Sequence, residues 1–308
     1  MKSASHLSIA GVSAALVAGC AYGVGGTVSQ IVKSQGFALN HIVVAQFLAA
    51  TIILGFFVVV RFRPHAKPSE VIKLMLVGAM SVSSSYFYYY AIDYLSVGSA
   101  VAIQFQYVWI AVVLTSIAAK RLPSIWVAMS AVFIIAGSML ASGLVDEMLS
   151  GKLVMNPVGL MCGFGCALTY GLFIFLNGRV ATDVNPVART FFMVLAGLIM
   201  SVVIAPDFFT GSCDVIAIIP GGIAMGLIMS VIPCVCLAVA AVKIPGGIVA
   251  ILTSLELPTA VLSGAVILGE TVTPLVIIGV VIILASIVLS EADSLLRRAK
   301  PEAHASRQ

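Results

Sequence analysis

Long apolar segments follow one another along the whole chain, separated by short polar or Gly- and Pro-containing breaks. A helix needs about 20 apolar residues to cross the hydrocarbon core of a bilayer, and these segments approach that length. Strands of a membrane β-barrel would instead alternate in polarity over about 10 residues, and these segments do not. The pattern predicts ten membrane-spanning helices, at residues 8–32, 40–60, 71–93, 97–119, 124–144, 156–179, 187–206, 215–242, 246–269 and 274–291.

Prolines mark four of the predicted helix starts. Pro157, Pro186, Pro245 and Pro274 each lie where an apolar segment begins. A proline in the first turn of a helix costs no hydrogen bond, because the N–H groups of that turn have no partner within the helix. These prolines therefore indicate where the sixth, seventh, ninth and tenth helices begin.

Composition agrees with a membrane location. Of the 308 residues, 61% are hydrophobic and 9% are charged, whereas a soluble domain carries about 25% charged residues. So few charges cannot cover the surface of a soluble protein of this length, which excludes a secreted, nuclear or cytosolic enzyme. We therefore expect an all-α polytopic membrane protein.

Basic residues give the expected orientation, because Lys and Arg are retained in cytoplasmic loops. With the N-terminus inside, only Lys33 and Lys152 of the 16 Lys and Arg residues fall on the far side of the membrane. An even number of helices brings both termini to the same side. We expect a multi-pass protein of the inner (plasma) membrane, with both termini in the cytoplasm.

Two ungapped alignments relate the halves of the chain. Residues 9–46 align with 157–194, and residues 91–142 align with 241–292. Five helices in each half is an odd number, so the halves would enter the membrane in opposite directions, as an inverted repeat with its two-fold axis in the membrane plane. The expected division is a first five-helix repeat at 1–147, a second at 148–296 and a cytoplasmic tail at 297–308.

Glu256 is the only charged residue deep within a predicted span. A charge at the centre of a membrane helix costs about 2.5 to 3.5 kcal/mol, so such residues face a cavity or a partner. Thr253 lies on the same helix face. Pro258 lacks the N–H that the Ser254 carbonyl would accept, so this carbonyl is expected to be free. A structural, hydrogen-bonded glutamate and a simple packing kink are the alternatives.

Gln104 and Gln106 occupy the positions in the fourth span that correspond to Ser254 and Glu256 in the ninth. Two residues apart on a helix means about 200° around its axis, so the two side chains cannot face the same way. We expect Gln106 to line a cavity and Gln104 to bond a neighbouring helix, and both belong to the candidate site.

Tyrosines are the other candidates. Tyr22 and its repeat equivalent Tyr170 each lie among small residues. Close helix packing explains the glycines of this helix face, whereas the two tyrosines are expected to line a cavity. Tyr86 and Tyr90 share a face of the third span, where they could stack a planar or cationic substrate. The alternative for these two is an interfacial aromatic belt.

Arg189 and His41 begin the seventh and second spans at equivalent repeat positions. Arginine near a helix end normally extends to the lipid headgroups, so a structural or gating role is expected for both.

The remaining motifs predict no cofactor and no metal. The six cysteines lie mostly in apolar segments, where a thiol behaves as a small hydrophobe, and no disulfide is expected. Val17-Ala18-Gly19-Cys20 resembles a lipoprotein cleavage site, but the apolar segment continues past it as the first span requires. No nucleotide-binding loop, catalytic triad or basic nucleic-acid stripe is present, and the chain is not expected to be an enzyme.

The most specific motifs lie between Pro245 and Pro274. They are Ala250-Ile251-Leu252, Leu257-Pro258 and Ile267-Leu268-Gly269-Glu270-Thr271-Val272, with Tyr170-Gly171 earlier in the second repeat. Over about residues 8–292 the chain resembles the EamA-type transporters of the drug/metabolite transporter superfamily. The first repeat departs from the family pattern, because Val108 stands at its proline position and Lys120 at its glutamate position.

The resemblance implies ten helices in two repeats, a central cavity, and export of amino acids or other small metabolites. We expect a secondary transporter in which one repeat rocks against the other. Its expected partners are a small-molecule substrate and the lipid bilayer, with a proton as a further candidate. Glu256 would either bind an ammonium group of the substrate or exchange a proton. The alternatives are a facilitator or exchanger for nucleosides or nucleotide sugars, a membrane-embedded enzyme, and an assembly or receptor subunit.

Overall fold

The computed structural model describes residues 8–62, 66–151, 153, 155–211 and 213–299, and these residues contain helices and connections but no strand. The structure confirms the expected all-α fold class. Five of the basic residues that gave the expected orientation lie outside the described residues: Lys2, Arg63, Lys152, Lys300 and Arg307. The expected tail 297–308 lies outside them from residue 300 onward.

The helices of the first half follow the apolar segments, with one interruption. They are α1 (Ile9–Ser34), α2 (Leu39–Phe57) with the π-helical turn η1 (Val58–Phe62), α3 (Pro68–Tyr94), α4 (Val97–Gln104), α5 (Tyr107–Ala119), α6 (Ile125–Ala141) and the short α7 (Leu144–Leu149). The predicted fourth span is thus two helices, α4 and α5.

The second half repeats this order. Its helices are α8 (Pro157–Asn177), α9 (Pro186–Ile204), η2 (Pro206–Phe209), α10 (Val215–Met225), η3 (Gly226–Val231), α11 (Ile232–Ala241), α12 (Gly246–Thr253), α13 (Glu256–Ser263), η4 (Gly264–Leu268) and α14 (Pro274–Ala299). The proline prediction is confirmed, because α8, α9 and α14 begin at a proline and α12 begins directly after Pro245.

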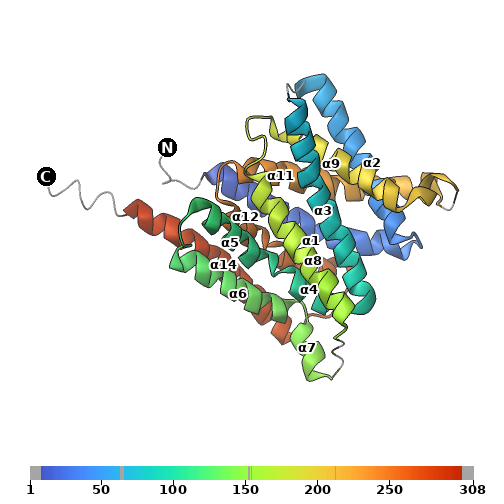
Figure 1. Ribbon diagram of the computed structural model, residues 1–308. Coiled ribbons are helices and arrows are strands. Elements are labelled where there is room, and N and C mark those ends of the chain that lie inside the picture. The colour runs from blue at the N-terminus through green and yellow to red at the C-terminus, as the bar shows by residue number, and fades with distance from the viewer. Residues whose placement is uncertain (1–7, 63–65, 152, 154, 212, 300–308) are drawn as a thin grey trace.

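Eight of the helical segments are long and apolar enough to cross a bilayer, so the protein is a multi-pass membrane protein. Two shorter apolar helices, Ile125–Ala141 and Pro274–Ser290, fall where the fifth and tenth spans were predicted. The seventeen residues of α6 measure about 25 Å at 1.5 Å each, slightly less than the hydrocarbon core, whereas α14 continues to Ala299 and is long enough to cross it. These two helices, α6 and α14, lie side by side along one edge of the molecule (Figure 1).

Packing between the halves is symmetric. α3 packs on α8 as α11 packs on α1, and α3 packs on α9 as α10 packs on α2. Likewise α4 and α5 pack on α8 as α12 and α13 pack on α1, while α2 packs on α9, α5 on α12 and α6 on α14. When α4–α5 and α12–α13 are each counted as one span, exchanging the two halves turns each of these contacts into itself or into another contact of the set.

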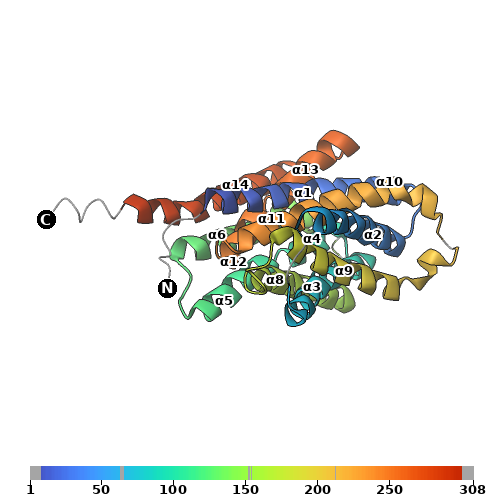
Figure 2. The same ribbon diagram turned by 90° about the horizontal axis from the view of Figure 1, so that it is seen from above.

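Contacts within each half are much sparser than contacts between the halves. The helices can instead be assigned to two mixed groups, according to whether they pack more closely on α1 or on α8. The α1 group contains α1, α10, α11, α12 and α13, and the α8 group contains α3, α4, α5 and α8. Figure 2 shows α1 and α13 on one side of the molecule and α3 and α8 on the other. The two repeats are interlocked, because the largest packing surfaces lie between them.

Small residues of α1 let this helix approach α13 closely, but they do not all serve that purpose. A Cβ atom at Gly23 would press on the Glu256 carbonyl and lie 2.6 Å from Cβ of Thr259, whereas one at Gly26 would have no neighbour within 4 Å. One turn further along, the hydroxyls of Thr27 and Ser263 lie 2.6 Å apart and join the same two helices. Close packing thus requires glycine at Gly23 and leaves Gly26 free to change.

This difference predicts opposite effects from one substitution made at two sites. Gly23→Ala should lower the free energy of unfolding by about 1–3 kcal/mol, because the added methyl group forces α1 away from α13. Gly26→Ala should leave it unchanged or raise it by up to about 1 kcal/mol, because alanine has the higher helix propensity. Thermal unfolding of the purified protein in detergent measures both, and equal losses would contradict the packing described here.

Candidate functional site

Two helices are broken at equivalent positions of the repeats. α4 ends at Gln104 and α5 begins at Tyr107, while α12 ends at Thr253 and α13 begins at Glu256. With the repeat offset of 150, the two breaks lie within one residue of each other. Discontinuous helices at the interface of two repeats are where membrane carriers place their binding sites, because the interrupted backbone leaves polar groups near the midplane.

The backbone at both breaks tightens rather than opens. The Leu257 N–H donates to the Ser254 carbonyl at 3.3 Å, and the Val108 N–H donates to the Phe105 carbonyl at 3.2 Å. The prediction of a free Ser254 carbonyl is therefore wrong. At the break the chain adopts the i→i+3 pattern of a 3₁₀ turn, so the carbonyl finds a donor one residue before the proline.

Glu256 is the first residue of α13 and not the centre of a continuous helix. The N-terminus of a helix carries a partial positive charge, which favours a carboxylate there. The carboxyl oxygen Oε2 is nevertheless buried and has no hydrogen-bond partner among the described residues. Leaving such an oxygen unpaired away from water is costly, so this carboxyl retains capacity to bind a donor.

Four tyrosines and a cysteine lie within electrostatic range of the Glu256 carboxyl: Tyr22, Tyr88, Tyr107, Tyr170 and Cys166. The Tyr170 ring makes edge contacts with Tyr107 at 4.7 Å and with Tyr22 at 6.2 Å between centroids. Its hydroxyl is buried without a partner in the described part of the chain. Glu256 and these four tyrosines are called the carboxyl cluster below.

Thr253 holds part of this cluster in place. Its hydroxyl is fully buried and donates to the Val249 and Ala250 carbonyls at 3.0 Å. The Tyr107 hydroxyl lies 3.4 Å from both the Thr253 oxygen and the Ala250 carbonyl. This contact joins the break in the α8 group to the break in the α1 group.

Tyr22 and Tyr170, predicted from the sequence, therefore lie within electrostatic range of Glu256, whereas no hydrogen bond joins the glutamines to this cluster among the described residues. Gln106 donates to the Ala102 carbonyl at 3.4 Å and accepts from the indole N–H of the exposed Trp109 at 3.0 Å. Gln104 is half-buried at the end of α4. No hydrogen bond between described residues links either glutamine to Glu256, and their part in binding stays a prediction.

Tyr86 and Tyr90 also lie apart from the cluster. Tyr86 packs with Phe47 and Leu54 in an apolar core between α2, α3 and α9, and Tyr90 is half exposed at the surface. Tyr88 is the tyrosine of this segment that lies within electrostatic range of Glu256. One turn earlier, the Ser84 hydroxyl donates to the Cys166 carbonyl at 3.2 Å, so the face that carries Ser84 and Tyr88 is the one turned toward α8.

Arg189 is the largest fully buried side chain of the described residues. Its guanidinium donates to the Ala238 carbonyl at 3.2 Å, to the Asn177 carbonyl, and to the Asn177 side-chain oxygen at 3.0 Å. These carbonyls belong to the last turns of α11 and α8, where the helix dipole favours a cation. The expectation that Arg189 extends to the headgroups is wrong, because two helix ends supply its acceptors inside the protein.

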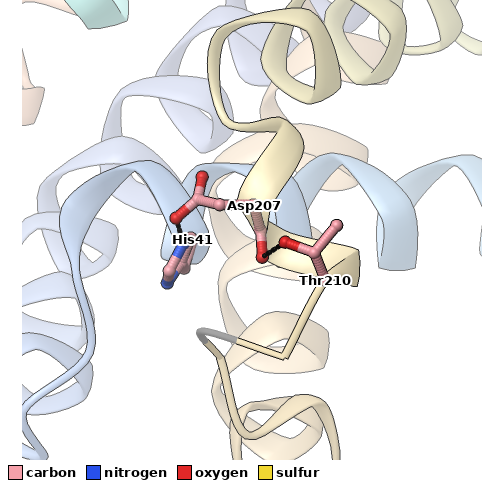
Figure 3. Close-up of polar contacts among 3 residues, drawn as sticks. All are labelled: His41, Asp207 and Thr210. Atoms are coloured by element: carbon pink, nitrogen blue, oxygen red, sulfur yellow. Dashed lines mark hydrogen bonds and ion pairs between the residues drawn. The ribbon is translucent and has the colours of Figure 1, made fainter.

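His41, the repeat equivalent of Arg189, has a different partner. Its Nε2 atom lies 2.9 Å from Oδ2 of Asp207, and the Thr210 hydroxyl donates to the Asp207 carbonyl at 3.2 Å (Figure 3). The imidazole also packs edge-on against Phe208. These contacts tie the start of α2 to the connection between α9 and α10, which is a structural role.

The fold is that of a polytopic α-helical membrane protein whose two related halves meet at the carboxyl cluster. The family model described as the EamA-like transporter family matches residues 9–143 and again residues 157–291. The chain therefore belongs to the EamA-like transporter family, as its motifs predicted, and is a membrane transporter of the drug/metabolite transporter superfamily.

A solved structure titled "Crystal structure of protein" is similar in fold. Its TM-score is 0.75 at 15% identity, over 93% of this chain and 98% of that one. At such low identity the similarity concerns the fold alone. The search of curated proteins gave no match.

Arg189→Gln should lower the free energy of unfolding by about 3 kcal/mol, because two buried helix ends lose their donor. Arg179→Gln is the matched control. Arg179 is exposed and its guanidinium lies over the Phe175 ring, 4.0 Å from the centroid, so its loss should cost about 0.5 kcal/mol. Thermal unfolding in detergent compares the two variants, and an Arg189 variant as stable as the control would show that the buried contacts contribute little.

Proposed function

We propose that the protein is a secondary transporter that exports amino acids or other small metabolites by alternating access. It would span the inner membrane ten times, as two inverted five-helix repeats. The exchange symmetry of the packing supports this arrangement, because a two-fold axis between halves of five helices each must lie in the membrane plane. The start of α1 and the end of α14 lie at the same end of the molecule (Figure 1), in agreement with two cytoplasmic termini.

One observation carries the proposal: a buried carboxyl oxygen without a hydrogen-bond partner among the described residues lies at one of two equivalent helix breaks. Irregular backbone at membrane depth is tolerated where it is covered by protein or lines a cavity. A carboxyl group there gains from binding a cation, either the ammonium of a substrate or a proton. Glu256 is proposed to do one or both of these.

Site residues are divided between the two mixed groups. Glu256, Tyr22 and Thr253 belong to the α1 group, whereas Tyr88, Tyr107 and Tyr170 belong to the α8 group. Tilting one group against the other would open the carboxyl cluster to one side of the membrane at a time. The moving bodies are thus the mixed groups, and each contains helices from both repeats.

A facilitator of nucleotide sugars or other anionic metabolites is the competing function. Such a substrate requires a basic side chain near the site, because a buried anion needs a partner. The helices that carry the carboxyl cluster contain basic residues only near their ends, Lys33 in α1 and Lys73 in α3. This charge distribution argues against an anionic substrate.

Glu256→Gln should abolish flux of the transported solute in proteoliposomes, or remove its dependence on a proton gradient, while the amount of folded protein stays unchanged. The amide has the shape of the carboxyl but carries no charge and exchanges no proton. Asp183→Asn is the control, because Asp183 is exposed in the connection between α8 and α9. A screen of amino acids, amines and nucleosides identifies the solute. Unchanged flux and pH dependence in Glu256→Gln would contradict the assignment.

A further inference from the structure

We propose that the carboxyl cluster selects a monocationic organic amine that has an apolar body and keeps at least one N–H, in preference to a zwitterionic amino acid. This inference rests on the proposed transport function and narrows its substrate class. Three features of the site support it: its charge, its unpaired hydrogen-bonding atoms and its aromatic rings.

The charge of the site favours a cation without a carboxylate. Glu256 has no ion-pair partner among the described residues. The buried Arg189 is held by the carbonyls of Asn177 and Ala238. A zwitterion brought to Glu256 would therefore place its own carboxylate near another acid with no cation to balance it, and like charges in a poorly hydrated site repel strongly.

Two unpaired atoms call for a hydrogen-bond donor. Oε2 of Glu256 and the Tyr170 hydroxyl are both buried without partners in the described structure, and each can accept a hydrogen bond. An ammonium with N–H groups satisfies them, whereas a quaternary ammonium of the same charge has no hydrogen to donate. Hydrogen bonds to charged groups are the stronger ones, so the N–H should matter for affinity.

The aromatic rings are the third feature. Tyr170 makes edge contacts with both Tyr22 and Tyr107 and stacks on Phe173. Aromatic faces attract organic cations, more so when water is excluded. They also provide an apolar surface for the body of the amine.

A matched series of probes separates these features: phenethylamine, its N,N,N-trimethyl derivative and phenylalanine. The three share one aromatic body and differ in the N–H and in the carboxylate. We expect phenethylamine to bind the purified protein, and to move in proteoliposomes, at least about tenfold better than the other two, which corresponds to one charged hydrogen bond. Glu256→Gln should remove this preference.

Tyr170→Phe tests the hydroxyl without removing the ring. It should weaken binding of phenethylamine about tenfold and leave binding of the trimethyl derivative unchanged. Tyr94→Phe is the control, because Tyr94 is exposed at the end of α3. A Tyr170 variant that weakens both amines equally would show that the hydroxyl does not receive the N–H, and would contradict that part of the inference.

If phenylalanine is bound or transported to the same extent as phenethylamine, the amine inference is wrong, but the proposed transport function still stands. Equal affinities for the trimethyl derivative and phenethylamine would overturn the N–H requirement. Absence of any phenethylamine binding would also overturn the inference. Only the failure of every solute in the wider screen, with folded wild-type protein, would count against transport itself.

Discussion

The buried carboxyl oxygen of Glu256, which has no partner among the described residues, is the constraint around which the rest of the cluster is organised. It lies at the first residue of α13, where the helix dipole favours negative charge. Gly23 allows α1 to cover this point closely, and Thr253 and Tyr107 join the break to its counterpart in the other repeat. Packing and the backbone thus hold a single acid in the interior, and its carboxyl oxygen can still accept a hydrogen bond from a ligand.

The interlocking of the two repeats explains how such a site can serve a carrier. Because the largest packing surfaces lie between repeats, each mixed group combines helices of both. The carboxyl cluster lies where the two groups meet, so a change in their relative tilt would reach every member of the cluster at once. Arg189, which ties the ends of α8 and α11, links the groups at a second place.

Local sequence signals predicted the elements, and long-range packing determined the site. Proline positions gave the helix starts, and the depth of Glu256 in an apolar segment gave the acid. The break before Tyr107 was not predicted, because Val108 stands where a proline would have marked it. Spacing alone could have suggested that Ser84 and Tyr88 share a face, but only the position of α8 shows that this face turns inward. Arg189 was misjudged because its acceptors are the ends of two distant helices.

Access of water to the carboxyl cluster tests the account most directly. Cys166 and Cys234 approach the cluster from the two groups: Cys166 lies within electrostatic range of Glu256, and the Cys234 thiol lies 3.7 Å from the Tyr22 hydroxyl. In a variant that retains only these two cysteines, a membrane-impermeant thiol reagent should reach them from either side of the membrane, and substrate should slow the reaction. If the thiols react only with a lipid-soluble reagent, with or without substrate, the result would contradict a carrier site at this position.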